Sequence, residues 1–177
     1  MLYALLGGFG VAALAAWLHR LTGRHSGWVL ALWPTTLLLY FLSFLPDINS
    51  GTVLFYYDWI PSLQIRLSFR IDGLSLLFAL LISGIGMFIV AYAGRYLEGH
   101  RDLGRFYVIL LAFMSSMLGV VLADNLIALF VFWELTSITS YLLIGFNHED
   151  ASARRSALQG LFVTVGGGLA LMTGLIM

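Results

Sequence analysis

Six long stretches of this chain carry no charge or only one. Each has about 18 residues or more, enough for an α-helix to cross a ~30 Å hydrocarbon core at ~1.5 Å per residue. We therefore expect an all-α integral membrane protein with six transmembrane helices. The first stretch has no basic segment before it, which argues against a cleaved signal peptide. The stretches are Met1–Leu18, Ser26–Pro46, Gly73–Gly94, Phe106–Ala123, Asn125–Asn147 and Ser156–Met177.

Composition supports the membrane class and excludes several functions. Only 10% of the residues are charged, against ~25% in soluble domains. Nine basic and nine acidic residues cancel, so nothing indicates a nucleic-acid partner. The chain has no cysteine, and its four histidines are widely spaced at the edges of the apolar stretches. We therefore expect no metal and no cofactor. Phosphate-binding, dinucleotide and nucleophile motifs are absent, so an enzyme is not expected.

The arginines are distributed unevenly between alternate connections. Residues 19–25, 95–105 and 147–155 hold seven of the nine, whereas the long connection Asp47–Asp72 holds the other two. The positive-inside rule places the seven in the cytoplasm. We therefore expect a multi-pass membrane protein with its N-terminus outside.

The long connection contains a predicted β-hairpin. Asp47–Gly51 and Pro61-Ser62 are rich in turn residues, and Thr52–Tyr57 is rich in aromatic residues. Leu63–Ile71 alternates apolar and polar residues with a period of two. This pattern predicts a short external hairpin between the second and third helices, with one face against the helix ends. The chain thus divides into residues 1–46 (helices one and two), 47–72 (the hairpin), 73–94 (helix three) and 95–177 (helices four to six).

Glu134 is the only charged residue in Asn125–Asn147. It lies nine residues from the start of that stretch, roughly 13 Å along the helix and near the midplane of a bilayer. A carboxylate there costs at least several kcal/mol unless it is protonated, paired or hydrated. Two interpretations are open: a proton or ion path, or a structural acid bonded to a neighbouring helix.

Two polar residues share a helical face with Glu134. Ser137 and Tyr141 lie three and seven positions after it. Such a face is suited to a water chain that reaches the carboxylate, and equally to hydrogen bonds with a neighbouring helix.

Three aspartates precede apolar runs. Asp72, Asp124 and Asp150 suit the N-cap position, where a carboxylate accepts from free amide groups at the positive end of a helix. Capping is the preferred interpretation for Asp72 and Asp150. Asp124 opens the helix of Glu134, so it is also a candidate for the proton entrance.

A series of short motifs is similar to those of one protein family. They are Asp58–Leu63, Ile71–Leu74, Leu77–Ile82, Gly84–Gly86, Phe106–Val108, Met117–Asn125 and Phe132–Ser137. On these motifs the chain resembles the A subunit of Mrp-type multisubunit Na⁺/H⁺ antiporters. That subunit is related to the antiporter-like subunits of respiratory complex I and of membrane-bound hydrogenases. The resemblance covers essentially the whole chain, and the Trp133-Glu134 pair is its most specific element.

The resemblance implies a function and a location, the bacterial cell (cytoplasmic) membrane. The chain is expected to contribute to the proton path of a monovalent cation/proton antiporter, with other subunits as partners and Na⁺ and H⁺ as transported ions. Glu134 matches the central glutamate of the fifth helix, which in relatives pairs with a lysine on a broken seventh helix. The alternative is a proton-translocating subunit of a complex I-like NADH:quinone oxidoreductase or a membrane-bound hydrogenase. A third class is a purely structural membrane subunit.

Two departures from the family pattern refine this expectation. The chain stops at Met177 and contains no lysine, so we expect an N-terminal fragment that does not exchange ions by itself. Complex I relatives usually read Arg-Val-Gly-Asp in the sixth helix, where this chain has the glycine-rich run Val165–Gly168. That difference favours the antiporter over the redox-driven complex.

Overall fold

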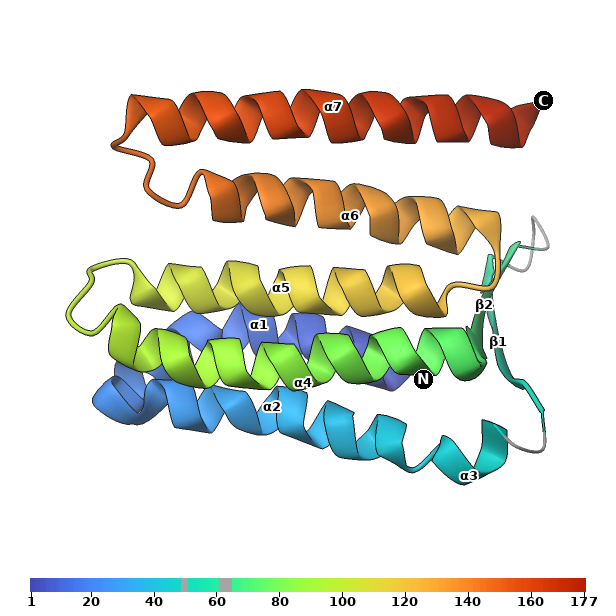
Figure 1. The fold of residues 1–177 in the computed structure, drawn as a ribbon, viewed down its shortest axis with the longest axis horizontal. Coiled ribbons are helices and arrows are strands. Elements are labelled where there is room, and N and C mark those ends of the chain that lie inside the picture. Colours follow the sequence, from blue (N-terminus) through green and yellow to red (C-terminus); the bar gives the residue numbers. More distant parts are fainter. Residues whose placement is uncertain (49–50, 61–64) are drawn as a thin grey trace.

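The computed structural model describes residues 1–48, 51–60 and 65–177. Long helices run side by side through this part of the chain (Figure 1). They are α1 (Leu2–Thr22), α2 (Ser26–Leu42), α4 (Gly73–Tyr96), α5 (Leu103–Leu122), α6 (Leu126–Ile144) and α7 (Ala151–Ile176). The short helices η1 (Gly23–His25) and α3 (Leu45–Ile48) precede and follow α2.

The long helices are apolar enough for a multi-pass membrane protein. Among the described residues, five segments qualify as candidate membrane spans by length and composition. The first, Leu2–Ile48, has 47 residues and contains both α1 and α2, which pack against each other. The others are Gly73–Tyr96, Leu103–Leu122, Leu126–Ile144 and Ala151–Gly174.

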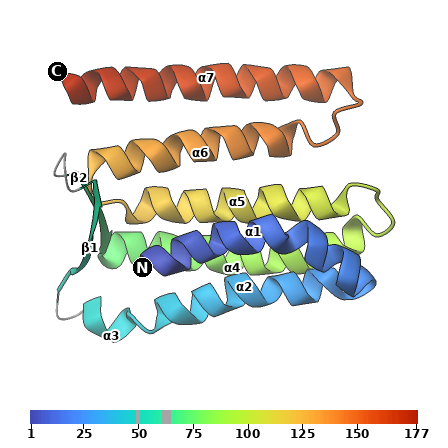
Figure 2. The same ribbon diagram turned by 180° about the vertical axis from the view of Figure 1, so that it is seen from behind.

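Each long helix packs against specific neighbours. In the bundle, α2 packs on α4, α1 on α5, α5 on α6 and α6 on α7, which leaves α7 at one edge (Figures 1 and 2). Phe41, Tyr107 and Leu111 are fully buried between helices. Large apolar residues on the outer faces stay exposed, as with Phe88 and Phe162. An apolar exterior is what a helix bundle in lipid requires.

A two-stranded sheet crosses one end of the bundle (Figure 2). β1 (Val53–Ile60) pairs with β2 (Ile65–Ile71) in an antiparallel register that places Phe55 opposite Phe69. Phe69 and Ile71 are fully buried, and the Phe69 ring lies 6.1 Å from that of Phe132 in α6. The predicted hairpin is therefore confirmed as a sheet.

The sequence also predicted one turn before β1 and one between the two strands. Asp47 and Ile48 end the short helix α3, so the expected turn over Asp47–Gly51 is wrong for these two residues. Pro46 is the second residue of α3, and a proline fits the first turn of a helix because no amide hydrogen is needed there. The expected turn at Pro61-Ser62 lies outside the described residues.

The two ends of the bundle differ in charge. At the hairpin end, the Tyr57 hydroxyl accepts from the Leu2 amide at 3.4 Å, which places the N-terminus beside the sheet. The turns between α1 and α2, α4 and α5, and α6 and α7 lie at the opposite end (Figure 1). We call it the arginine-rich end. Its arginines are Arg20, Arg24, Arg95, Arg101, Arg105, Arg154 and Arg155.

Candidate functional site

Glu134 lies on α6 and directs its carboxylate at α7. Its Oε1 atom is buried and has no hydrogen-bond partner within the described residues. A Cβ placed on Gly168 of α7 would overlap Oε1 and lie 3.2 Å from Cδ of Glu134. The carboxylate therefore occupies space that exists because residue 168 has no side chain.

The neighbouring glycines of α7 have no such role. Within the described part of the chain, a Cβ on Gly166 or on Gly167 would have no heavy atom within 4 Å outside its own helical turn. The helix runs without a break through all three glycines. Gly168 alone among the three makes room for the carboxylate.

The hydroxyl groups near Glu134 bond within their own helix. Thr136 donates to the Phe132 carbonyl at 2.8 Å, and Ser137 donates to the Trp133 carbonyl at 3.1 Å. Such bonds to the preceding turn are common for Ser and Thr inside helices. The interhelical bond considered for Ser137 is not seen, and no hydrogen bond joins Glu134 to Ser137 or Tyr141 within the described residues.

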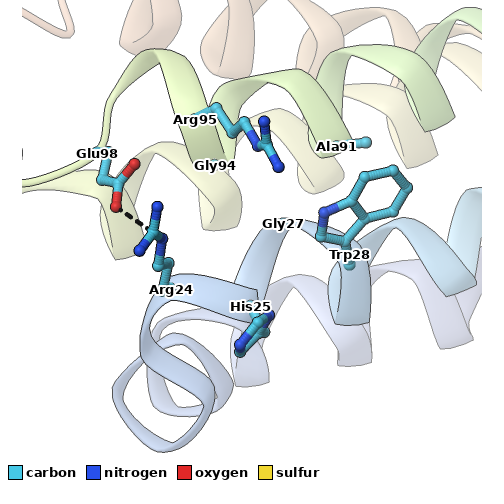
Figure 3. A pocket seen from close by; sticks show the side chains of 8 residues that line it. All are labelled: Arg24, His25, Gly27, Trp28, Ala91, Gly94, Arg95 and Glu98. Atoms are coloured by element: carbon cyan, nitrogen blue, oxygen red, sulfur yellow. Dashed lines mark ion pairs between the residues drawn. The ribbon is translucent and has the colours of Figure 1, made fainter.

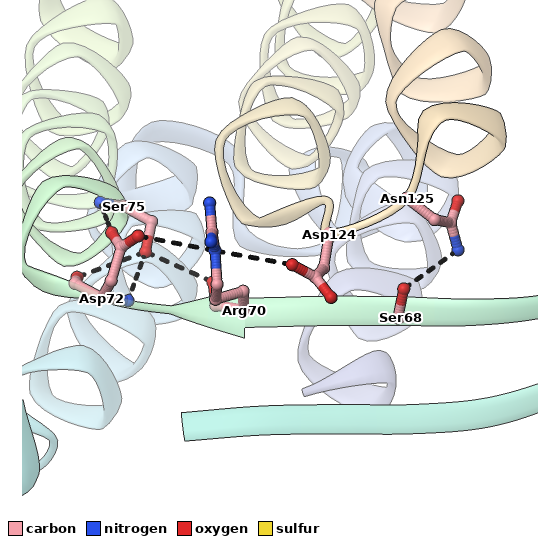
Figure 4. Close-up of polar contacts among 6 residues, drawn as sticks. All are labelled: Ser68, Arg70, Asp72, Ser75, Asp124 and Asn125. Atoms are coloured by element: carbon pink, nitrogen blue, oxygen red, sulfur yellow. Dashed lines mark hydrogen bonds and ion pairs between the residues drawn. The ribbon is translucent and has the colours of Figure 1, made fainter. Parts of the chain in front are cut away.

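Asp124 is not the cap of α6, which corrects the sequence-based expectation. The cap is Asn125, whose Oδ1 accepts from the Ala128 amide at 2.6 Å. Asp124 instead pairs with Arg70 of β2, with 3.5 Å between Oδ1 and Nε (Figure 4). Asp124 lies ten residues before Glu134, about 15 Å along the axis of α6. The structure therefore does not bring these two carboxylates together.

Arg70 connects two helix starts at the hairpin end. Its Nε also lies 3.5 Å from Oδ2 of Asp72 (Figure 4). Asp72 and Ser75 form a reciprocal capping box at the start of α4: Oδ1 accepts from the Ser75 amide, and the Ser75 hydroxyl accepts from the Asp72 amide, both at 2.8 Å. Arg70 therefore lies between the start of α4 and the segment that leads into α6.

The capping box affects the titration of Asp72. The Ser75 amide holds the pKa of this carboxyl below its ordinary value, and the Ser75 hydroxyl and Arg70 act in the same direction. Because the pKa of Asp72 is lowered in the folded state, its contribution to the free energy of unfolding is present at neutral pH and is lost as the pH falls through the lowered value.

Asp150 caps a helix at the other end of the bundle. Its Oδ1 accepts from the Ser152 amide at 2.8 Å at the start of α7.

Comparisons with known proteins bear on both halves of the chain. Residues 59–107 match the family described as NADH-ubiquinone oxidoreductase (complex I), chain 5 N-terminus. Residues 123–177, which contain Glu134 and Gly168, match the family described as NADH:quinone oxidoreductase/Mrp antiporter, TM.

Two curated relatives are subunits of Na⁺/H⁺ antiporters. The chain is 47% identical over 154 residues to the A1 subunit of a Na⁺/H⁺ antiporter from Staphylococcus haemolyticus, a match that covers 86% of this chain and 19% of the relative. It is 43% identical over 175 residues to the A subunit of a Na⁺/H⁺ antiporter from Alkalihalophilus pseudofirmus, covering 97% and 22%. The chain is a homologue of the N-terminal part of the Mrp-type A subunit. It spans about one fifth of the length of these relatives.

Solved structures agree with the sequence relatives. The fold superposes on a chain of the Mrp complex from Dietzia sp. DQ12-45-1b with a TM-score of 0.83 and 38% identity, covering 96% of this chain and 18% of that one. A chain of the membrane-bound sulfane sulfur reductase, an archaeal respiratory membrane complex, gives a TM-score of 0.76 at 18% identity, covering 96% and 26%. The second match shows a shared fold.

Two parts of the site in this Mrp homologue were not foreseen. The position of Arg70 between Asp72 and Asp124 depends on tertiary packing, and no local pattern signals it. The cap at Asn125 had a signal, because asparagine directly before an apolar run is a favoured N-cap.

Asn125 should be important for stability, because it also contacts the hairpin. Its Nδ2 donates to the Arg66 carbonyl at 2.5 Å and to the Ser68 hydroxyl at 3.1 Å. We expect Asn125→Ala to lower the free energy of unfolding by about 2 kcal/mol, with the cap and the hairpin bonds each contributing about half. Asn125→Asp keeps the cap acceptor and should lose only about half as much.

Thermal unfolding of the purified complex, followed by the loss of its size-exclusion peak, measures the effect. Asn147→Ala is the matched control, because this asparagine is exposed in the α6–α7 turn. Equal Tm values for Asn125→Ala and Asn147→Ala would contradict the assignment.

Proposed function

We propose that this chain forms the N-terminal part of one subunit of a monovalent cation/proton antiporter, in which Glu134 is a protonatable group on the proton path. The observation that carries the proposal is the buried Oε1, which faces Gly168 without a hydrogen-bond partner in the described residues. A purely structural acid would be expected to bond to a neighbouring helix, as most buried polar groups do. Na⁺-driven proton movement by a complex that carries Glu134→Gln tests the proposal, and loss of exchange is expected.

The chemistry of the site follows from the two charge states of a carboxyl group. Desolvation favours the neutral acid, and an approaching cation favours the carboxylate. Glu134 would therefore take up a proton when its cationic partner withdraws and release it when that partner returns. The family resemblance assigns the partner to a lysine on a later helix, and residues 1–177 contain no lysine.

The runner-up function is a proton-translocating subunit of a redox-driven complex. The family match over residues 59–107, named for complex I, supports it. The relatives at 43–47% identity are antiporter subunits, and the run Val165–Gly168 lacks the acid of complex I relatives. The antiporter is therefore favoured, with Na⁺ and H⁺ as the proposed ions and the other antiporter subunits as partners.

We propose six membrane crossings, with the arginine-rich end in the cytoplasm and the hairpin outside. The two helices in the 47-residue span Leu2–Ile48 would each cross once, because 21 and 17 residues extend about 32 and 26 Å.

Single cysteines report this topology directly, since the chain has none of its own. In intact cells, an impermeant thiol reagent is expected to label Tyr56→Cys in β1 and to leave Arg101→Cys unlabelled until the membrane is opened. Tyr56 is 60% exposed, so access does not depend on local unfolding. Labelling of Arg101→Cys alone would overturn the proposed orientation. Labelling of both cysteines in intact cells would contradict the single membrane crossing by α4 that is proposed between them.

A further inference from the structure

A small polar cavity lies between α2 and α4 at the arginine-rich end (Figure 3). Its volume is about 60 Å³, and Gly27 and Gly94 form part of its wall. These glycines bring the two helices close together, since a Cβ on Gly94 would lie 3.1 Å from the Gly27 Cα. The longer side chains that line the cavity include Arg24, Trp28, Arg95 and Glu98.

The cavity carries more positive than negative charge, because Arg24 and Arg95 face a single acidic residue, Glu98. Arg24 Nε pairs with Glu98 Oε1 at 3.1 Å, and both side chains are well exposed, so this bridge contributes little to stability. The Arg95 side chain has no ion pair or hydrogen bond with the described residues. In Figure 3 its guanidinium points from α4 toward α2, on the side where Trp28 stands. The Arg95 guanidinium is therefore available to bind an anion, and the Arg24 guanidinium is paired only with the exposed carboxylate of Glu98.

Aromatic residues place the cavity at the level of lipid headgroups. Trp28 is 64% exposed, and Tyr92 and Tyr96 on α4 are 64% and 71% exposed. The two tyrosines stack with 5.4 Å between ring centroids. Exposed Trp and Tyr gather where the hydrocarbon core meets the headgroups. Phosphate groups of the surrounding lipid lie at this level.

Apolar surface continues from the cavity toward the middle of the bundle. Leu32 lies one turn beyond Trp28 on α2, and Phe88 lies one turn before Tyr92 on α4. Both remain exposed, at 64% and 68%. An acyl chain has a path along this surface while its headgroup occupies the cavity.

We propose that this cavity binds the phosphate of an anionic phospholipid, such as phosphatidylglycerol. Arg95 binds the phosphate oxygens through its paired N–H groups, a geometry that suits a guanidinium. Arg24 provides the second positive charge, and Glu98 opposes binding. Basic pockets between transmembrane helices are known to hold anionic headgroups in this way. The site is independent of whether Glu134 carries protons.

Native mass spectrometry of the complete antiporter complex tests the proposal, with short-chain phosphatidylglycerol titrated into delipidated detergent solution. Arg95→Gln is expected to weaken the binding of one phosphatidylglycerol by about tenfold. Glu98→Gln is expected to tighten it, because Arg24 is released. Arg101→Gln is the charge-matched control, since this arginine lies at the same end outside the cavity, and it should change affinity by less than about twofold.

Two further probes identify the ligand. Diacylglycerol, which has the acyl chains without a phosphate, should not compete, and competition equal to that of phosphatidylglycerol would overturn the proposal. Inorganic phosphate should compete only weakly because it lacks acyl chains, and equal competition would reassign the cavity to free phosphate. Equal effects of Arg95→Gln and Arg101→Gln, or no gain from Glu98→Gln, would leave only a general attraction of the arginine-rich end for anions.

Discussion

Replacing Glu134 by glutamine in the complete antiporter complex is expected to abolish Na⁺-driven proton release while the complex still assembles. Glutamine keeps the size of the side chain and fits the space beside Gly168, but it cannot carry a proton. Glu134→Ala is expected to be equally inactive. Glu134→Asp keeps the titrating group on a shorter arm and should retain partial activity with a shifted pH profile.

The measurement is addition of Na⁺ to everted vesicles that hold a preformed pH gradient, together with the yield of assembled complex. A structural role predicts a different pattern, in which alanine impairs assembly and glutamine is nearly normal. Exchange at the wild-type rate by an assembled Glu134→Gln complex would leave this residue without a proton role.

The second large effect is expected at Gly168. A methyl group there overlaps the Glu134 carboxylate, so Gly168→Ala must either displace the carboxylate or push α7 away from α6. Because Oε1 is the far end of a flexible side chain, displacement of the carboxylate is the cheaper of the two. On the proposed function, a displaced carboxylate no longer lies on the proton path. We expect at least a tenfold loss of exchange, which corresponds to ~1.4 kcal/mol or more.

Gly167→Ala is the matched control, because it adds the same methyl group to the same helix at a position where no described neighbour lies within 4 Å. Combining Gly168→Ala with Glu134→Asp separates a steric mechanism from a general defect. The aspartate is shorter by one methylene, so the double variant should exchange faster than Gly168→Ala alone. Equal losses in the two glycine variants, or no rescue by the aspartate, would contradict the steric account.

The helices and the sheet were largely predictable from the sequence, because charge placement and alternation are local signals. The expected stretch Ser26–Pro46 was less accurate. Helix α2 ends at Leu42 and a new helix begins at Leu45, because Pro46 suits a first turn better than a continuing one. Charge counting alone cannot detect such an interruption.

The candidate site was predictable only in part. Glu134 was identified because a single charge in an apolar stretch is visible in the sequence. Its contact with Gly168 was not, since that contact depends on the rotation of α6 against α7. The pairing of Asp124 with Arg70 likewise joins segments that only the folded chain brings together. Distances along the sequence carry no information on either contact.

The bonds around Asn125 have a mechanical consequence for the helix that carries Glu134. Asn125 and Asp124 tie the start of α6 to β2 through hydrogen bonds and an ion pair, whereas the far end is held by ring contacts of Phe146 with His100 and Phe106. Because packing contacts are non-directional and fixed hydrogen bonds are not, a tilt of α6 would pivot at the hairpin end. Glu134 lies about 13 Å from that pivot and Ile144 about 28 Å, so the far end sweeps roughly twice the arc of the carboxylate. A spectroscopic label near Ile144 would thus report displacements of the Glu134 carboxylate that are too small to follow at Glu134 itself.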